Sequence, residues 1–332
     1  MRYLIQFPHH PSEISGVLTY VRHLEKTLEQ SNDQVTKVST KSQGFRDWFQ
    51  AMKGVDVIHQ NSNHFVFALL GKLMGKRVIL KYHFPIYHKV LSIYGEDWQK
   101  ENPGFWNSFS KEVYLLLFRK RRPWRALVYD AVQVLRLSTI AACSLIVDER
   151  WACSNALRDH CQLPVSVKTV YNPFSPEPDE NPQNPTRDTI VFAGRLSSKK
   201  GIEILVRAIA HLKDQANLPK VRILGDGGRM EFLTGLVKEL GIEERVDFLG
   251  QVDSKTVKAE MQRAIAVVIP SLCFDPAPYV VWEAMNAGAV PIVANRGGLP
   301  ELAGEDGIIV PTYDPKDFAK AIQQVLSTSK VS

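Results

Sequence analysis

The chain has 332 residues, of which 45% are hydrophobic and 23% charged, with a formal net charge of +6 at pH 7. These values are typical of a globular protein and exclude a disordered or fibrous chain. The length is sufficient for two domains. The basic excess, with a pI near 9.0, favours anionic partners such as nucleotides, phosphates, nucleic acid or acidic lipids.

The four cysteines have neither the spacing of a metal site nor that of a disulfide framework: Cys143, Cys153, Cys161 and Cys273. A reducing compartment is the simplest interpretation. The apolar part of the N-terminal segment 1–16 is too short for a signal peptide, so we predict a first strand there. Together these features predict a cytoplasmic protein.

Strand-like segments alternate with helical periodicity along the first half. A helix is predicted over 15–30, where apolar residues recur on one face. Strands are predicted at 3–7, 35–39, 55–60 and 77–83. The apolar stretch 126–147 contains Asp130 and Arg136, which make a membrane span unfavourable, so we predict a buried helix followed by a strand.

The segment 172–186 is rich in proline and acidic residues and is predicted to be a linker between an N-terminal domain, 1–171, and a C-terminal domain, 187–332. In the second half the alternation is more regular. Strands are expected at 189–193, 220–225, 245–250, 266–271, 290–294 and 307–311, and helices at 201–214, 229–240, 254–264, 279–287 and 315–327. This order predicts an α/β fold of two doubly wound domains that face each other across a cleft.

The loop after the strand at 189–193 has the composition of an anion site. It contains Arg195, Lys199 and Lys200 together with Gly194 and Gly201, and a helix follows it. Arginine binds phosphate bidentately and lysine acts as a point charge, while glycine allows the backbone to approach a ligand. By itself the loop is equally compatible with a solvated basic turn.

The loop 224–230 also joins a strand to a helix and contains three glycines, but it does not have the G-x-G-x-x-G spacing of a dinucleotide site. The first strand–helix turn, 7–16, does not have this spacing either. An ordinary tight turn and a ligand loop both remain open for 224–230. A nicotinamide oxidoreductase is excluded by this absence.

The segment 270–302 contains the strongest chemical signal. Asp275 stands in a proline-rich loop, and Glu283 stands in an otherwise apolar helix, where Pro278 is placed near the first turn. A carboxylate in that position is costly to bury unless a partner such as a ribose or sugar hydroxyl pairs with it. The glycine-rich loop 295–301 can then present backbone N–H groups to a ligand.

Residues 187–328 resemble the nucleotide-sugar domain of retaining glycosyltransferases of family 4, which have the GT-B architecture. The resemblance rests on the ordered segments FAGRL, KKGIEIL, ILGDGG, VDFLGQV, DPAPYVVWEAM and GGLPEL. It implies that Arg195 and Lys200 bind the donor diphosphate, that Glu283 binds the ribose hydroxyls, and that Asp275 and the backbone after it contact the transferred sugar. Family members commonly have glutamate at Asp275 and often glycine at Pro278.

The N-terminal half resembles the acceptor domain of the same family more loosely. The resemblance implies that Gly16 approaches the donor phosphates, that His83 contacts sugar, and that Asn172 is a structural residue at the interdomain hinge. His59 is interpreted as a hydrogen-bonded strand-end histidine, and His9, His10 and His88 remain unranked candidates. The implied catalytic residues are therefore His83 and Asp275. The implied donor-binding residues are Gly16, Arg195, Lys200, Gly225, Asp275, Pro276, Ala277, Pro278, Tyr279 and Glu283.

The predicted reaction is transfer of a sugar from a nucleoside-diphosphate sugar, of UDP or GDP type, to a hydroxyl of a glycan, glycolipid or lipid-linked acceptor. The resemblance implies retention through front-face attack assisted by the leaving phosphate. No Asp-x-Asp pair is present, and neither a metal nor another cofactor is expected. An alternative is a nucleotide-sugar-binding protein without transferase activity, because family members usually continue for one or two helices beyond the segment that ends here.

The segment 114–136 places basic residues beside Phe118 and Trp124: Arg119, Lys120, Arg121, Arg122 and Arg125. This pattern suits an anionic membrane surface, which would make the protein peripheral to the inner face of a membrane. A solvated basic helix end is the equally weighted alternative. Nucleic acid is not expected as a partner, because it would leave segment 270–302 unexplained.

Overall fold

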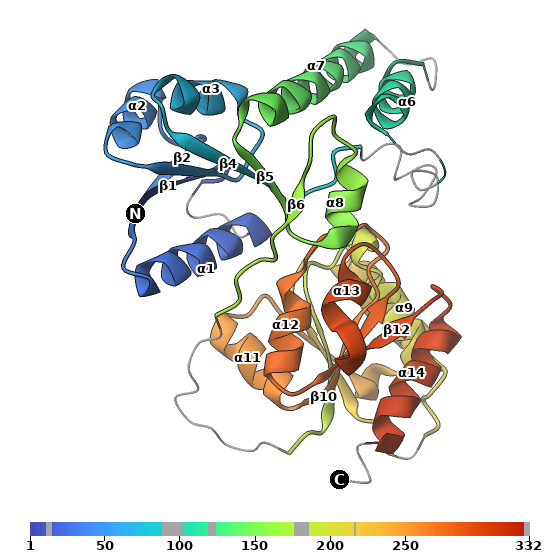
Figure 1. Ribbon diagram of the computed structural model, residues 1–332. Helices are drawn as coiled ribbons and strands as arrows, with labels where there is room; N and C mark the ends of the chain where they lie inside the picture. The colour runs from blue at the N-terminus through green and yellow to red at the C-terminus, as the bar shows by residue number, and fades with distance from the viewer. Residues whose placement is uncertain are drawn as a thin grey trace. The chain divides into compact units, whose positions relative to one another are not determined.

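The computed structural model describes residues 1–10, 15–87, 101, 104–118, 124–175, 186–215 and 217–328, with the backbone alone for 115–118 and 124–130. The chain forms two compact units, Met1–Ser175 and Pro176–Ser332 (Figure 1). The division falls inside the proline-rich segment 172–186, most of which lies outside the described residues.

The described part of the first unit contains these elements: β1 (Arg2–Phe7), α1 (Gly16–Gln30), β2 (Gln34–Ser39), α2 (Phe45–Lys53), β3 (Val57–Gln60), α3 (Phe65–Leu73), β4 (Arg77–Tyr82), α6 (Phe105–Phe118), α7 (Trp124–Ile146), β5 (Glu149–Ala152), α8 (Asn155–Cys161) and β6 (Lys168–Thr169). The strands form one parallel sheet in the order β2-β1-β3-β4-β5-β6. Figure 1 shows α1 on one face of this sheet and α2 and α3 on the other.

The second unit contains these elements: β7 (Thr189–Ala193), η1 (Ser198–Lys200), α9 (Ile202–Ala210), β8 (Lys220–Leu224), α10 (Met230–Glu239), η2 (Glu243–Arg245), β9 (Val246–Gly250), α11 (Ser254–Gln262), β10 (Ala264–Ile269), α12 (Tyr279–Asn286), β11 (Val290–Ala294), α13 (Leu299–Ala303), η3 (Gly304–Asp306), β12 (Ile308–Val310) and α14 (Pro315–Thr328). Its parallel sheet has the order β12-β11-β10-β7-β8-β9. Helices α12 and α14 both pack on β10 and β11. Helix α9 packs beside α14, and helix α13 packs beside α12, so two separate groups of helices cover the two faces of the sheet.

Both sheets are doubly wound, and each has one point where the strand order reverses. The reversal lies between β1 and β3 in the first unit and between β7 and β10 in the second. At such a point two neighbouring loops diverge to opposite faces of the sheet and leave room for a ligand. The topology therefore directs attention to the loops after β1 and β3, and to the loops after β7 and β10.

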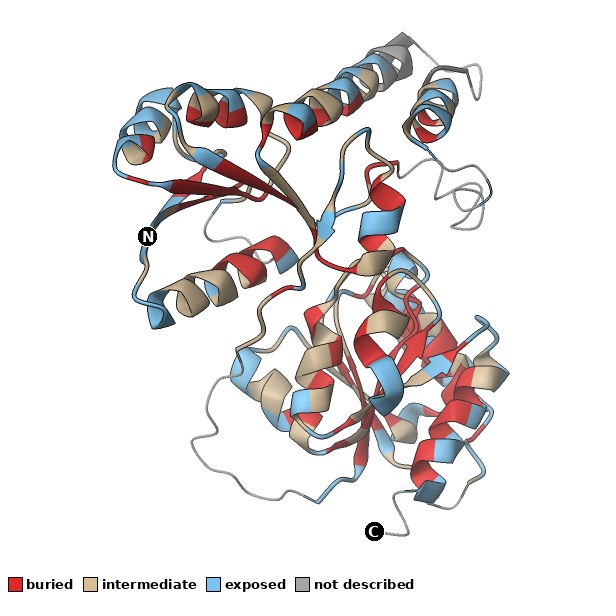
Figure 2. Cartoon of the chain, viewed as in Figure 1, coloured by how far each residue is buried: buried red, intermediate tan, exposed pale blue. Residues whose placement is uncertain are grey.

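The central strands β1, β3 and β4 of the first sheet and β7, β10 and β11 of the second are mostly buried, as Figure 2 shows in red. The edge strands β2, β6 and β9 are more exposed. In β7 and β10 the buried positions include Ile190, Val191, Phe192, Val267 and Val268, which form part of one continuous apolar core. Strands covered on both faces are expected to be continuously apolar rather than alternating. Each fully buried aliphatic side chain contributes about 1.5–3 kcal/mol of transfer free energy.

A lysine is buried in the first unit. Lys81, in β4, is only 1% exposed, and its Nζ donates to the carbonyl oxygen of Val170 at 2.7 Å and lies 4.6 Å from the centre of the Tyr20 ring. Burial lowers the pKa of Lys81 to about 8. The ammonium group thus ties β4 to the end of β6 and places a positive charge beneath the carboxyl ends of the strands.

Two expectations from the sequence are wrong. The segment 126–147 is part of a single helix, α7, rather than a helix followed by a strand, because it contains neither glycine nor proline to interrupt the helix. It is not wholly buried, since Val132 and Leu135 are exposed. The segment 295–301 is also not entirely a loop, because α13 begins at Leu299 with Pro300 in its first turn, where proline is well tolerated.

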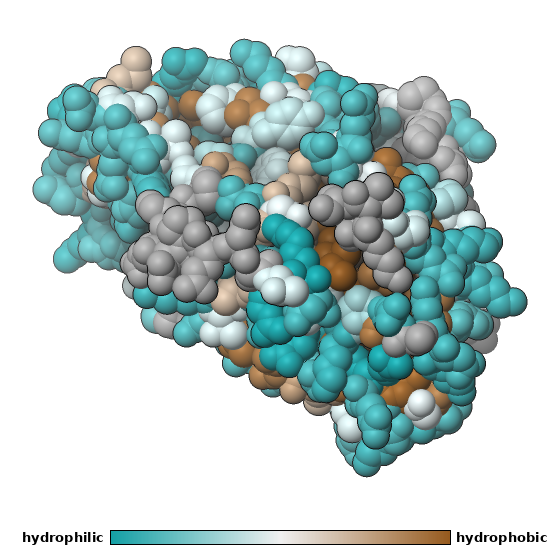
Figure 3. All heavy atoms as spheres, turned by 90° about the horizontal axis from the view of Figure 1, so that it is seen from below, coloured by the Kyte–Doolittle hydropathy of each residue, from teal (hydrophilic) through white to brown (hydrophobic). Residues whose placement is uncertain are grey.

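In the described part of the chain, no helix combines the length and apolar character that crossing a membrane requires. On the face shown in Figure 3 hydrophilic residues predominate and hydrophobic residues form small separate groups.

Candidate functional site

The candidate site of the second unit is formed by four loops at one edge of its sheet. They follow β7, β8, β10 and β11, and because all these strands are parallel their carboxyl ends lie at the same edge. The loops after β7 and β10 flank the point where the strand order reverses. All the predicted donor-binding residues except Gly16 are in these loops or in the helix α12 that follows one of them.

Glycines allow these loops to pack backbone against backbone. Gly225 has φ +130°, and a Cβ there would collide with the carbonyl oxygen of Gly194 in the neighbouring loop. Gly201 has φ +66°, and a Cβ there would collide with the carbonyl oxygen of Pro270. The N–H of Leu272 donates to the carbonyl oxygen of Lys199 at 2.9 Å. Each loop therefore restricts the position of its neighbour.

The loops after β10 and β11 are joined in the same way. Gly297 has φ +57°, and a Cβ there would lie 2.6 Å from the carbonyl oxygen of Asp275. The N–H of Gly298 donates to that same oxygen at 2.8 Å. The backbone at Asp275 is thus fixed by the glycine-rich loop 295–298.

The structure brings Lys200 and Asp275 together. The Nζ of Lys200 donates to Oδ1 of Asp275 at 2.9 Å and to Oδ2 at 2.7 Å, and the hydroxyl of Ser271 donates to Oδ2 at 2.7 Å. Both oxygens of the carboxylate are therefore held, and the positive charge of Lys200 is shared with it. Ser271 is buried and was missed by the sequence reasoning, although its place at the end of the predicted strand 266–271 could have indicated it.

Glu283 is a half-buried carboxyl group on α12 for which no described residue serves as a hydrogen-bond partner. Burial raises its pKa above the ordinary value of glutamate. Arg195 is exposed, and its guanidinium forms no ion pair or hydrogen bond with the described residues. Unlike Lys200, these two groups are available to a ligand.

The remaining predicted residues of this site surround the start of α12. Pro276 and Ala277 are half-buried, and Pro278 is the N-cap residue rather than part of the first turn. Tyr279 begins the helix and is buried. Gly16 is the first residue of α1 in the other unit, with open space around its Cα.

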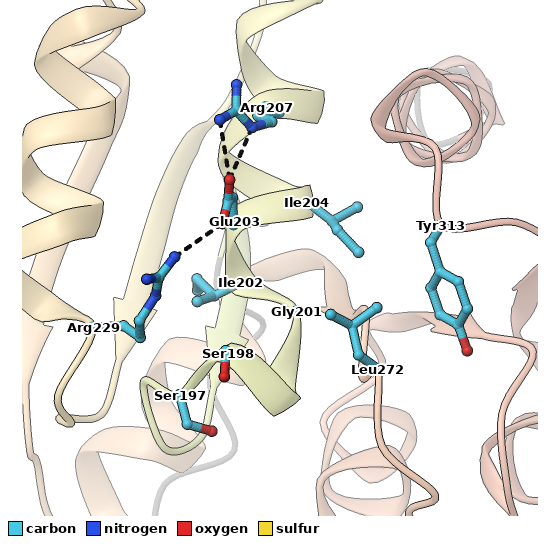
Figure 4. A pocket seen from close by; sticks show the side chains of 10 residues that line it. All are labelled: Ser197, Ser198, Gly201, Ile202, Glu203, Ile204, Arg207, Arg229, Leu272 and Tyr313. Carbon is cyan, nitrogen blue, oxygen red and sulfur yellow. Dashed lines mark hydrogen bonds and ion pairs between the residues drawn. The ribbon is translucent and has the colours of Figure 1, made fainter. Parts of the chain in front are cut away.

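A depression of about 340 Å³ borders the loop after β7 (Figure 4). It is lined by Ser197, Ser198 and the first turn of α9, but not by Arg195, Lys200 or Glu283. Glu203 lies between two arginines and accepts hydrogen bonds from Arg207 and from Arg229, each at 3.0 Å (Figure 4). This bridge connects α9 to the start of α10 and braces the loops after β7 and β8.

His83, the site residue predicted in the first unit, lies just after β4. Its Nε2 is 2.9 Å from Oδ1 of Asn61, which follows β3. His59 is buried, with its Nε2 2.9 Å from the hydroxyl of Tyr20, as expected for a strand-end histidine. His88 lies outside the described residues.

Asn61 and Gln6 were missed by the sequence reasoning. The buried Gln6 side chain accepts from the N–H of Asn61 at 3.1 Å and donates to the hydroxyls of Thr40 and Ser62 at 2.9 and 2.8 Å. It therefore fixes the loop after β3 from the neighbouring strand β1. Polar residues at the carboxyl ends of predicted strands were the signal that could have identified both.

Asn172 is buried, and its Oδ1 has no hydrogen-bond partner within the described chain. In the same described ranges, no cluster of three or more histidine, cysteine or acidic side chains has the arrangement of a metal site.

The family model of glycosyl transferases group 1 matches residues 174–332. These residues span the second unit, which contains the four interlocked loops. The resemblance to group 1 glycosyl transferases seen in the sequence is therefore confirmed for this part of the chain.

Curated relatives match over a similar length of the chain. An uncharacterized glycosyltransferase of Methanocaldococcus jannaschii, MJ1607, is 39% identical over 140 residues, which are 42% of this chain and 35% of the relative. A putative colanic acid biosynthesis glycosyltransferase of Escherichia coli, WcaL, is 32% identical over 157 residues, 45% of this chain and 38% of the relative. The matched region thus spans well under half the length of these curated relatives.

The predicted fold is confirmed over both units. The structure of Anabaena Alr3699/HepE in complex with UDP-glucose has a TM-score of 0.66, with 17% sequence identity, over 99% of this chain and 91% of that chain. At this level of identity the likeness establishes the GT-B fold of this chain and nothing about its ligand.

We expect Gly225→Ala to destabilise the second unit. A side chain at this φ is strained and would push the loop away from Gly194, which costs about 2 kcal/mol or more. Gly228→Ala in the same loop is the matched control, because nothing lies within 4 Å of a Cβ there. Thermal unfolding followed by circular dichroism should give a lower midpoint for Gly225→Ala, and equal midpoints would contradict the backbone packing described above.

We expect Glu283→Gln to stabilise the free protein at pH 7. A carboxyl whose pKa is raised in the folded state destabilises that state at every pH above its unfolded value, and the full cost is present at neutral pH. The gain should disappear at about pH 3, below the pKa of glutamate in the unfolded chain, where the carboxyl is largely protonated in both states. Urea unfolding at the two pH values tests this, with the exposed Glu239→Gln as control. A loss of stability at pH 7 would show that Glu283 has a stabilising partner.

Proposed function

We propose that this protein is a retaining glycosyltransferase that transfers a sugar from a nucleoside-diphosphate sugar to an acceptor hydroxyl. The observation that carries the proposal is the unpaired, half-buried carboxyl of Glu283, on the helix that follows one loop of the switch point between β7 and β10. A buried carboxyl without a partner is costly, and the hydroxyls of a ribose would compensate for it. The match of the second unit to the group 1 family model supports this assignment.

In this proposal Arg195 and Lys200 bind the diphosphate. The guanidinium of Arg195 is unpaired, whereas Lys200 is held by Asp275 at 2.7 Å. The ammonium of Lys200 would then be shared between that carboxylate and the phosphate oxygens. Positive groups fixed before the reaction stabilise the negative charge that develops on the leaving diphosphate.

The chemical step breaks the bond between the anomeric carbon and the diphosphate oxygen and forms a bond from that carbon to the acceptor oxygen on the same face. The acceptor proton passes to the leaving phosphate, so no protein nucleophile is needed. Asp275, held by Ser271 and Lys200, would orient the sugar through its backbone and carboxylate. We propose that no metal takes part.

We propose a UDP-type donor and a glycan acceptor. The related structure of Anabaena HepE was solved with UDP-glucose, and the relative WcaL is named for colanic acid biosynthesis. A protein that binds nucleotide sugars without transferring them is the alternative, and the assay below separates the two.

The first test is a thermal-shift measurement with UDP, GDP and UDP-glucose, followed by an assay of UDP release. A ligand of the folded state raises the unfolding midpoint. We expect Arg195→Ala and Glu283→Gln each to weaken UDP binding by about tenfold to a hundredfold, since each removes a hydrogen bond to a charged group. Arg263→Ala is the matched control, because Arg263 is exposed and precedes β10 at the opposite edge of the sheet.

No shift with any nucleotide from folded protein would reject the proposed donor site. A shift without UDP release would favour the binding protein over the transferase. The anomeric configuration of the product, read by proton NMR, tests retention. Unchanged UDP release after EDTA treatment is expected if no metal is involved.

We also propose peripheral contact of the first unit with an anionic membrane. The five basic residues predicted to make this contact lie outside the described side chains, but Trp106 and Tyr114 on α6 are 74% and 54% exposed. Aromatic side chains beside basic ones suit the headgroup region. Replacing Arg119, Lys120, Arg121, Arg122 and Arg125 by glutamate should abolish sedimentation with phosphatidylglycerol vesicles, and undiminished sedimentation would remove this proposal.

A further inference from the structure

The first unit contains a cavity of about 370 Å³ at the carboxyl edge of its sheet. It is lined by residues that follow β1, β3 and β4, together with residues of α6 and α7. The loops after β1 and β3 flank the point where the order of this sheet reverses. The volume lies at the lower end of the range of small-molecule sites, so the cavity suits one small ligand rather than an extended one.

The hydrogen bonds of Asn61 determine which ring nitrogen of His83 carries the proton. The Nδ2 of Asn61 donates to the carbonyl oxygen of Gln6 at 2.9 Å, which leaves Oδ1 of Asn61 as the acceptor toward His83. Nε2 of His83 therefore carries the proton, and Nδ1 keeps its lone pair. Burial, with a smaller effect of the nearby Lys81 charge, holds the pKa of His83 well below its usual value, so the ring is neutral. His83 lines the cavity as a hydrogen-bond acceptor.

A donor and a second acceptor line the same cavity. Nδ1 of His64 accepts from the N–H of Phe67 at 3.2 Å, so its Nε2 carries the proton and can donate. Oδ1 of Asn63 is buried and has no hydrogen-bond partner among the described residues. A buried carbonyl without a partner is costly and calls for a donor such as a ligand hydroxyl. Hydroxyl groups, which both donate and accept, satisfy this set.

An aromatic ring completes the chemistry expected for a sugar. Phe84 lines the cavity and is 65% exposed, so its ring is accessible to a ligand. The C–H face of a pyranose ring presents weakly positive hydrogens that pack against the negative face of an aromatic ring. Amide, imidazole and phenyl groups together therefore favour a monosaccharide residue over a flat base or a lipid chain.

The charged residues favour a negatively charged sugar. Arg136, on α7, lines the cavity, is exposed, and forms no ion pair or hydrogen bond with the described side chains. Lys81 lies beneath and is also positive, whereas the acidic residue of the lining, Glu112, is 1% exposed. An anionic group of a ligand would thus meet an unpaired guanidinium at the accessible side, and arginine binds carboxylate and phosphate bidentately.

We propose that this cavity binds a terminal sugar of the acceptor and that this sugar carries a carboxylate or a phosphate. The inference rests on the proposed transferase function and adds to it the chemical class of the acceptor. His83 and Asn63 accept hydrogen bonds from sugar hydroxyls, His64 donates one, Phe84 packs on the ring, and Arg136 pairs with the anionic group.

Saturation-transfer NMR on the full chain tests the proposal with three probes: methyl β-D-glucopyranoside, methyl β-D-glucuronide and glucose 6-phosphate. We expect at least one charged probe to bind about tenfold more tightly than the uncharged glycoside, as a hydrogen-bonded ion pair would provide. Arg136→Gln should remove this preference. Arg46→Gln, an exposed arginine of α2 outside the cavity lining, should leave it unchanged. Which charged probe binds decides between a uronic acid and a sugar phosphate.

A Phe84→Ala variant and a competition experiment with UDP-glucose test the cavity further. Phe84→Ala, at an exposed position that leaves the core intact, should weaken all three probes. Saturating UDP-glucose should not displace a bound probe, and displacement would assign the cavity to the donor sugar and overturn the proposal. Equal binding of charged and uncharged probes would overturn the anionic class. Absence of probe binding in protein that still shifts with UDP would reject the acceptor cavity alone, whereas absence of both would reject the proposed function.

Discussion

The close approach of backbone to backbone at the carboxyl edge of the second sheet is the constraint on which the candidate site depends. Gly225 against Gly194, Gly201 against Pro270 and Gly297 against Asp275 are contacts that a Cβ would prevent. Because each loop rests on the next, the positions of Arg195, Lys200 and Asp275 follow from one shared arrangement rather than from three independent loops. Preorganisation of this kind is what electrostatic stabilisation of a leaving group requires.

In both units the candidate binding residues lie near the point where the strand order of the sheet reverses, but the two sets of residues differ in chemistry. In the second unit the reversal of strand order brings cations and a held carboxylate to the loops after β7 and β10. In the first unit amides and neutral histidines lie in the loops after β3 and β4, close to the reversal between β1 and β3, with an arginine from α7 beside them. A diphosphate suits the first set of groups and a hydroxylated ring suits the second, so the two sheets divide the proposed substrates by chemistry.

Several side chains near these edges destabilise the folded state, because they are polar or charged groups removed from water. Glu283 is half-buried without a partner among the described residues, Oδ1 of Asn63 has no hydrogen bond from a described residue, and Lys81 is buried with its pKa lowered. By contrast, the half-buried Arg222 is paired with Asp247 and Glu260. Violations of local rules that gather at one edge of each sheet are typical of functional sites.

The sequence by itself determined the α/β class, the strands of the second unit, the family that this unit resembles and the loops that carry the candidate donor residues, because period, glycine placement and motif order are local properties. It did not determine the single helix α7, since β-branched residues favour a strand only weakly and no helix breaker is present. The ion pair of Lys200 with Asp275 joins residues 75 positions apart. The cavity of the first unit joins the ends of three strands to α6 and α7. Only the tertiary structure decided such contacts, because spacing along a chain carries no information on which distant loops pack together.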